Sequence, residues 1–244
     1  MRDVLVVMRR ELRSYYLSPA GYVVGALIVG VSLFLGASAI QQGAPASAHA
    51  FFSWLPVVLL FFLPFVTMRL WAEERKLGTL ELLMTFPVRV SQLIAGKFLA
   101  AMVFLASLLA LTGVLPVVLD LYGELDWGPV LGAYAGALLM AGAYVAVGMF
   151  FSSLTRDQIV AGILALFVLL ALFLLGWPGF LLILEKAGFS DVVVAVLGGM
   201  SPYQYFSSIA RGVLDTRDLV YYAVFCGFFL HANAMVLDAR RLRG

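Results

Sequence analysis

Residues 159–180 read IVAGILALFVLLALFLLGWPGF, a stretch without one charged side chain that follows Arg156, Asp157 and Gln158. An α-helix needs about 20 predominantly apolar residues to cross the hydrocarbon core of a bilayer, which is ~30 Å thick. The stretch therefore predicts a transmembrane helix, and comparable apolar runs recur along the whole chain.

The composition excludes a soluble protein. Of the 244 residues, 63% are hydrophobic and 12% are charged, and the mean hydropathy is +1.02. A soluble domain of this length has too little interior to bury so much apolar surface. The sequence predicts an all-α integral membrane protein, a single permease-like domain over residues 1–244, with six spans at about residues 21–41, 52–71, 98–119, 129–152, 159–180 and 219–237.

Residues 2–16 predict an amphipathic helix that precedes the first span. Val4, Met8 and Leu12 recur at helical spacing, while arginines occupy another face. This pattern favours a helix lying in the membrane interface with its basic face toward anionic headgroups. The alternative is a plain cytoplasmic extension of the first span.

The basic residues predict the orientation. If both termini are cytoplasmic, 13 of the 16 lysines and arginines lie on the inner side, and only Lys186, Arg211 and Arg217 lie outside, in one long loop. Because cytoplasmic loops carry the excess of Lys and Arg, the skew predicts N-in and C-in.

The long external segment between the last two spans is itself apolar. Residues 189–214 contain two helical patterns separated by Gly198-Gly199, and neither pattern is long enough to cross a bilayer. We expect two short helices that re-enter from the external face; the alternative is an ordinary surface loop.

The segment after the second span is the most distinctive. Residues 67–97 read TMRLWAEERKLGTLELLMTFPVRVSQLIAGK, in which a charge cluster is followed by Gly78-Thr79 and a two-turn apolar helix that Pro87 ends. A short apolar helix at a cytoplasmic surface suits a groove on a partner protein. The alternative is that it lies against the membrane.

Three motifs then carry a resemblance. The pattern E-E-R-x-x-G-T-L-E-L-L-x-T-x-P-V begins at Glu73, R-E-L-x-x-Y-x-x-S-P-x-G-Y runs from Arg10 to Tyr22, and S-P-Y-x-x-F-x-x-I-x-R-G-V-L-D-T-R-D runs from Ser201 to Asp218. In this order they resemble ABC-2 type transporter permeases, and more narrowly the permease subunit of the gliding-motility-associated ABC transporters and their relatives.

The resemblance implies a type V exporter-like architecture with an interfacial helix, six spans, a cytoplasmic coupling helix and external re-entrant helices. It also implies a cytoplasmic ABC ATPase subunit and a second permease subunit, identical or related. On this chain the coupling helix would be residues 79–86, and the residues implied in ATPase coupling are Glu73, Glu74, Arg75, Thr79, Leu80, Glu81, Leu83, Met84 and Phe86.

The chain offers no ATP site of its own. A P-loop needs a glycine-rich loop that ends in Lys followed by Ser or Thr, but Gly96-Lys97 is followed by Phe98. His49 and His231 have no ligand-spaced partners, so no metal site is expected. We expect no catalytic residues and no cofactor on this chain, with ATP and Mg²⁺ on the partner subunit.

Polar residues within the spans are candidates for a cargo pathway. The functional interpretation is a path lined by some of them, and the alternative, favoured for isolated Ser, Thr and Asn, is interhelical hydrogen bonding. The sparsity of charge within the spans disfavours a proton-coupled carrier. The candidates are Thr67, Ser107, Thr112, His231 and Asn233.

The function predicted from these observations is that of a permease subunit in the bacterial cytoplasmic membrane. It would couple ATP hydrolysis by the ATPase subunit to export or to envelope remodelling. We do not expect it to bind nucleic acid. The alternative is a membrane scaffold of an ATPase-driven machine that acts on envelope proteins. An intramembrane enzyme is disfavoured, because no catalytic set converges.

Overall fold

The computed structural model describes residues 2–41, 49–80, 88–122, 125–212 and 215–241, and this part of the chain is helical throughout, without strands. The helices are α1 (Arg2–Leu17), α2 (Pro19–Gln41), α3 (His49–Thr67), α4 (Arg69–Lys76), α6 (Val90–Thr112), α7 (Val114–Tyr122), α8 (Trp127–Leu154), α9 (Gln158–Gly176), α10 (Pro178–Lys186), α11 (Asp191–Gly199), α12 (Pro202–Ile209) and α13 (Thr216–Arg241).

Within the described residues, six spans are long and apolar enough to cross a membrane, as the sequence predicted. They are Pro19–Ser38, Phe51–Lys76, Val90–Leu121, Trp127–Leu154, Gln158–Gly176 and Thr216–Arg240. The second continues through α3 into α4, and the third through α6 into α7. The chain is therefore a multi-pass, all-helical membrane protein.

Helix α8 lies at the centre of the bundle. It packs against α3, α4, α6, α9, α12 and α13. In the most apolar 18-residue stretch of α8, 72% is buried inside the protein, whereas the corresponding share for α13 is 11%. Small residues allow these contacts. A side chain at Gly148 would collide with Thr67 of α3, and one at Gly132 or Gly136 would press on Ile209 of α12. The Gly132–Gly136 pair thus serves packing within the chain.

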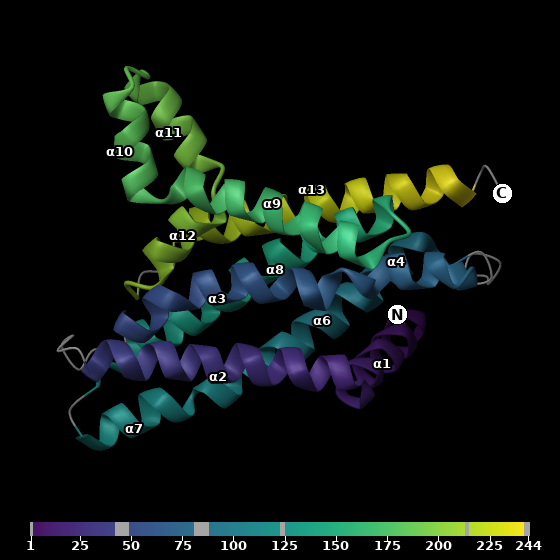
Figure 1. Ribbon diagram of the computed structural model, residues 1–244, viewed down its shortest axis with the longest axis horizontal. Coiled ribbons are helices and arrows are strands. Elements are labelled where there is room, and N and C mark those ends of the chain that lie inside the picture. Colours follow the sequence, from purple (N-terminus) through teal and green to yellow (C-terminus); the bar gives the residue numbers. More distant parts are fainter. Residues whose placement is uncertain (1, 42–48, 81–87, 123–124, 213–214, 242–244) are drawn as a thin grey trace.

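The start of α1 and the end of α13 lie at the same end of the bundle, together with α4 (Figure 1). At the opposite end, α10 and α11 stand out from the bundle, and α12 lies back against it. We call the end that holds the termini the basic end, because it carries Arg10, Arg69, Arg156 and Arg240.

The fifth span is shorter than predicted. The sequence placed its end at residue 180, whereas α9 ends at Gly176 and Pro178 starts the separate helix α10. The residue before a proline is pushed out of the α-helical region, and Trp177 is extended, with φ −78° and ψ 125°. Gly176 also faces the Ser201 side chain, so that the end of α9 meets the start of α12.

The predicted external helices correspond to α11 and α12. The break between them lies at Met200-Ser201 rather than at Gly198-Gly199, which belong to α11. Ser201 caps α12 by accepting a hydrogen bond from the Tyr203 backbone N–H at 3.2 Å. Helix α10 was not predicted, and re-entry of these helices into the bilayer stays a prediction.

Candidate functional site at the basic end

A buried lysine joins three helices at the basic end. Lys97 of α6 is 2% exposed, and its Nζ lies 2.9 Å from Glu11 Oε1 of α1 and 2.9 Å from Glu74 Oε1 of α4. A charge removed from water is tolerated only when it is paired and hydrogen-bonded. We call Glu11, Glu74 and Lys97 the Lys97 cluster, and it fixes α1 and α4 to the helix that forms the third span.

An aromatic ring completes the surroundings of the ammonium group. Lys97 Nζ lies 4.9 Å from the centroid of the fully buried Trp71 ring, in cation–π geometry. The side chains of Glu11 and Glu74 are 16% and 15% exposed, and Glu74 Oε2 is buried without a hydrogen-bond partner in the described part of the chain. The cluster carries one more negative than positive charge, and Arg10 acts electrostatically on Glu74.

A cavity of about 240 Å³ lies beside the cluster, with Lys97, Glu11 and Glu74 in its wall. Arg10 and Arg69 also line it, as do Leu77 and Thr79. Thr79, the first residue of the predicted coupling helix, therefore lies at the wall of this cavity.

Helix α4 is held against α8 by a serine. Ser152 Oγ accepts hydrogen bonds from the backbone N–H groups of Trp71, at 3.0 Å, and Ala72, at 3.1 Å. The same hydroxyl donates to the Met68 carbonyl at 2.8 Å. These backbone groups belong to the break between α3 and α4, where a helix leaves donors and acceptors without intrahelical partners. Arg75 Nη1 adds a bond to the Ser153 carbonyl at 3.0 Å.

Helix α1 is held against α6 by aromatic contacts. The rings of Tyr15 and Phe104 are stacked with centroids 5.0 Å apart, and the hydroxyls of Tyr16 and Ser107 lie 2.6 Å apart. Burial, and secondarily the charge of Glu11, raise the pKa of Tyr15 above its usual value, so its hydroxyl is neutral.

The structure places five of the nine predicted coupling residues. Glu73 is exposed, Glu74 belongs to the Lys97 cluster, and Arg75 binds the end of α8. Thr79 Oγ1 donates to the Glu74 carbonyl at 3.3 Å, and Leu80 is 7% exposed. The other four, Glu81, Leu83, Met84 and Phe86, lie outside the described residues.

Three of the predicted pathway residues lie at separate helix contacts. Thr67 is fully buried and donates to the Leu63 carbonyl at 3.0 Å within its own helix. Thr112 donates to the Leu109 carbonyl at 2.7 Å, and its hydroxyl lies 3.1 Å from that of Tyr134 in α8. Ser107 meets Tyr16 of α1.

The two predicted pathway residues of α13 differ in environment. His231 is exposed on the outer face of the helix. Asn233 is fully buried, and neither of its side-chain polar atoms has a hydrogen-bond partner in the part of the chain that the structure describes. The structure therefore does not gather the five candidates into one site.

Sequence reasoning missed Glu11, Trp71, Lys97 and Ser152. A signal for Lys97 was present, since an ionisable residue in an otherwise apolar helix requires a partner. Within the described residues, no group of three or more His, Cys, Asp or Glu side chains is arranged to hold a metal ion.

Comparisons with known proteins give two findings. The sequence profile of the ABC-2 family transporter proteins matches residues 60–210, more than half of the chain. The "Probable ABC transporter permease protein NosY" of Pseudomonas aeruginosa is 28% identical over 172 residues, which cover 65% of this chain and 62% of that relative. The match thus spans less than two thirds of that relative's length.

Proposed function

This chain belongs to the ABC-2 family of transporter proteins, and on that premise we propose that it is the permease subunit of an ATP-driven exporter. A separate ATPase subunit would bind and hydrolyse ATP with Mg²⁺. The membrane subunit would convert the approach of two ATPases into movement of its spans.

The observation that carries the proposal is the Lys97 cluster. Residues 77–89 connect α4 to α6 and contain the predicted coupling helix, and the ion pair between Glu74 and Lys97 joins the two helices at the base of this connection. A force exerted by the ATPase on residues 79–86 would therefore move α4 and α6 together. It would pass to α1 through Glu11 and to α8 through Ser152.

The wider assembly follows from the same premise. We propose two permease subunits, identical or related, each with an ATPase at residues 79–86, in a bacterial cytoplasmic membrane with both termini inside. The motifs quoted above support a relationship to the gliding-motility-associated permeases, and through them a role in envelope remodelling or contact with an envelope protein.

A second candidate function is a membrane scaffold that uses ATPase-driven motion on other envelope proteins. It is favoured by the separate placement of the five predicted pathway residues, which do not line one path through a single subunit. Both functions require the ATPase partner.

The test is co-expression of the full chain with the ATPase subunit of its own gene neighbourhood. The proposal predicts that the two purify together and that reconstituted complexes hydrolyse ATP. Stimulation of hydrolysis by a defined compound, with movement of that compound across the bilayer, would favour transport over the scaffold. Purification of the chain without any ATPase under conditions that preserve its fold would contradict both.

A further inference from the structure

Three arginines from distant parts of the sequence meet at the basic end. Arg75 is in α4, Arg156 lies between α8 and α9, and Arg240 is in the last turn of α13. Their positive charges are near enough to repel one another. Arg75 is repelled by Arg240 and Arg156, and Arg240 is repelled by Arg156. We call these three residues the arginine cluster.

The end of α8 holds two members of the cluster in place. Arg75 Nη1 donates to the Ser153 carbonyl at 3.0 Å, and Arg240 Nη2 donates to the Leu154 carbonyl at 3.2 Å. The C-terminal carbonyls of a helix carry partial negative charge, so they attract the guanidinium groups. Each of these two side chains uses one of its five N–H donors in this way.

No acidic side chain in the described part of the chain forms an ion pair with the cluster. The ion pairs found there are those of Lys97 with Glu11 and Glu74. Asp157 adjoins Arg156, but its carboxylate accepts from the backbone N–H groups of Ile159, at 2.8 Å, and Val160, at 3.4 Å. Arg156 is exposed and makes no hydrogen bond within the described residues. The cluster therefore presents positive charge and free donors.

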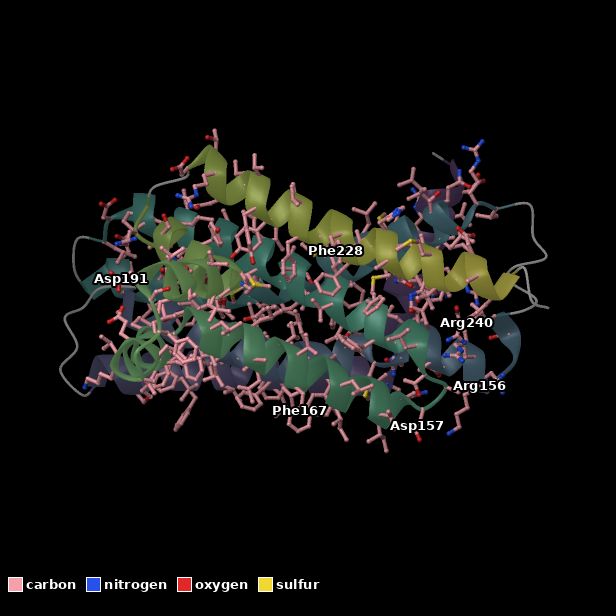
Figure 2. All side chains as sticks on the ribbon, turned by 90° about the horizontal axis from the view of Figure 1, so that it is seen from above. Arg156, Asp157, Phe167, Asp191, Phe228 and Arg240 are labelled. Atoms are coloured by element: carbon pink, nitrogen blue, oxygen red, sulfur yellow. The ribbon has the colours of Figure 1, made fainter. Side chains whose placement is uncertain are left out.

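Apolar surface begins directly beside the cluster. Leu154 is 40% exposed and Ile159 is 68% exposed. Figure 2 shows Arg156 and Arg240 at one end of the bundle, with Phe167 farther along α9 and Phe228 farther along α13. These two rings are each 66% exposed. Cationic donors at the rim of an apolar surface match a molecule with an anionic head and apolar chains.

We propose that the arginine cluster binds the phosphate of an anionic phospholipid, whose acyl chains lie along the exposed faces of α9 and α13. Guanidinium groups bind phosphate oxygens through paired N–H donors. Six spans place the end of α8 and the start of α9 at the membrane surface, where such headgroups are found. A free phosphate would use the arginines alone, whereas a phospholipid would also contact the apolar faces of α9 and α13.

The test compares phospholipids on the purified full chain. Native mass spectrometry in detergent would measure retention of phosphatidylglycerol against phosphatidylcholine in wild type, Arg156→Gln and Arg211→Gln. A juxtamembrane arginine contributes on the order of a fivefold gain in affinity for anionic lipid, so Arg156→Gln should weaken phosphatidylglycerol retention by about fivefold. Arg211→Gln removes the same charge from the opposite end and should leave retention unchanged.

Stability measurements complete the test, because Arg156 makes no hydrogen bond within the described residues. Arg156→Gln and wild type should unfold at the same temperature in phosphatidylcholine nanodiscs, and phosphatidylglycerol should stabilise wild type more. Three results would overturn the proposal: equal losses in both variants, equal stabilisation by inorganic phosphate, or loss of bound ATPase in Arg156→Gln with lipid retention unchanged. The last would assign the cluster to an acidic surface of the ATPase.

Discussion

Lys97 Nζ and Glu74 Oε1 lie 2.9 Å apart, and this contact joins the helix that ends the second span to the helix that begins the third. The two residues flank the connection that carries the predicted coupling helix. The contact is buried on the lysine side, where exposure is 2%. The strength of this contact therefore affects the stability of the folded subunit. It also affects how movement of the ATPase would be transmitted to the membrane spans.

Replacing Lys97 with Met should destabilise the subunit. The change leaves Glu11 and Glu74 facing each other without a cation, and breaking a buried pair in this way costs about 3 kcal/mol in the free energy of unfolding. Thermal unfolding in lipid nanodiscs would measure it. Lys76→Met, at the exposed end of α4, removes the same charge and should cost little.

A companion variant separates charge from packing. Lys97→Met combined with Glu11→Gln and Glu74→Gln leaves no unpaired charge in the cluster and should recover more than half of the lost stability. If Lys97→Met unfolds at the same temperature as Lys76→Met, the cluster does not hold the three helices together.

Replacing Ser152 with Ala should loosen α4 from α8. The hydroxyl serves the backbone N–H groups of Trp71 and Ala72 and the Met68 carbonyl, and leaving buried polar groups unpaired costs roughly 1–3 kcal/mol. Ser153→Ala is the matched control, since that equally buried hydroxyl bonds only to the Phe150 carbonyl of its own helix. Equal unfolding temperatures for the two variants would contradict this role of Ser152.

Replacing Leu83 with Asp should impair the contact with the ATPase while leaving membrane insertion intact. The sequence places Leu80, Leu83 and Met84 on one face of the predicted coupling helix. Leu80 is already buried within the subunit, at 7% exposure, so the partner's groove is left for Leu83 and Met84, whose full burial would contribute ~1.5–3 kcal/mol each, partly offset by association costs. The measurement is ATPase recovered per permease, together with hydrolysis in nanodiscs. Wild-type values for both would show that residues 79–86 are not the coupling helix.

The control for this variant is Leu109→Ala. Leu109 is 4% exposed in the last turn of α6, within the third span, so its truncation should lower stability by ~2–5 kcal/mol without selective loss of the ATPase.

The basic residues predict which loops face outward. In a background in which Cys226 is replaced by Ser, single cysteines near Gly43 and Glu124 should react with impermeant thiol reagents added to intact cells. Cysteines near Lys76 and Arg156 should react only after the membrane is opened, because positive loops stay inside. Labelling near Lys76 in intact cells would reverse the orientation.

The six spans were predictable because crossing a bilayer imposes a length and a polarity that a single sequence displays. The Lys97 cluster was not, since Glu11 lies 86 residues from Lys97 and no local pattern relates the two. Likewise, Gly176-Trp177-Pro178 contains a proline that ends a helix, but apolar residues continue beyond it, so hydropathy extended the span into α10.

The predicted external helices also combine a feature that a local sequence pattern reveals with a contact that it does not. Ser201-Pro202 is a local start signal, and α12 begins there. That Gly132 and Gly136 of α8 receive Ile209 and Phe206 of this helix depends on tertiary packing, which spacing alone does not reveal.

The central position of α8 also has a consequence for biogenesis. Chains enter the membrane from their N-terminus as they are synthesised. Until residues 127–154 have been inserted, the earlier helices have only one another, through contacts that include α1–α6, α2–α3, α1–α2 and α2–α6. Helix α8 then packs against both α3 and α6, and it offers its remaining faces to α9, α12 and α13. A chain truncated within the fourth span would lack Gly148, which packs against Thr67, and Ser152, which binds the Trp71 backbone N–H, and we expect membrane proteases to degrade it.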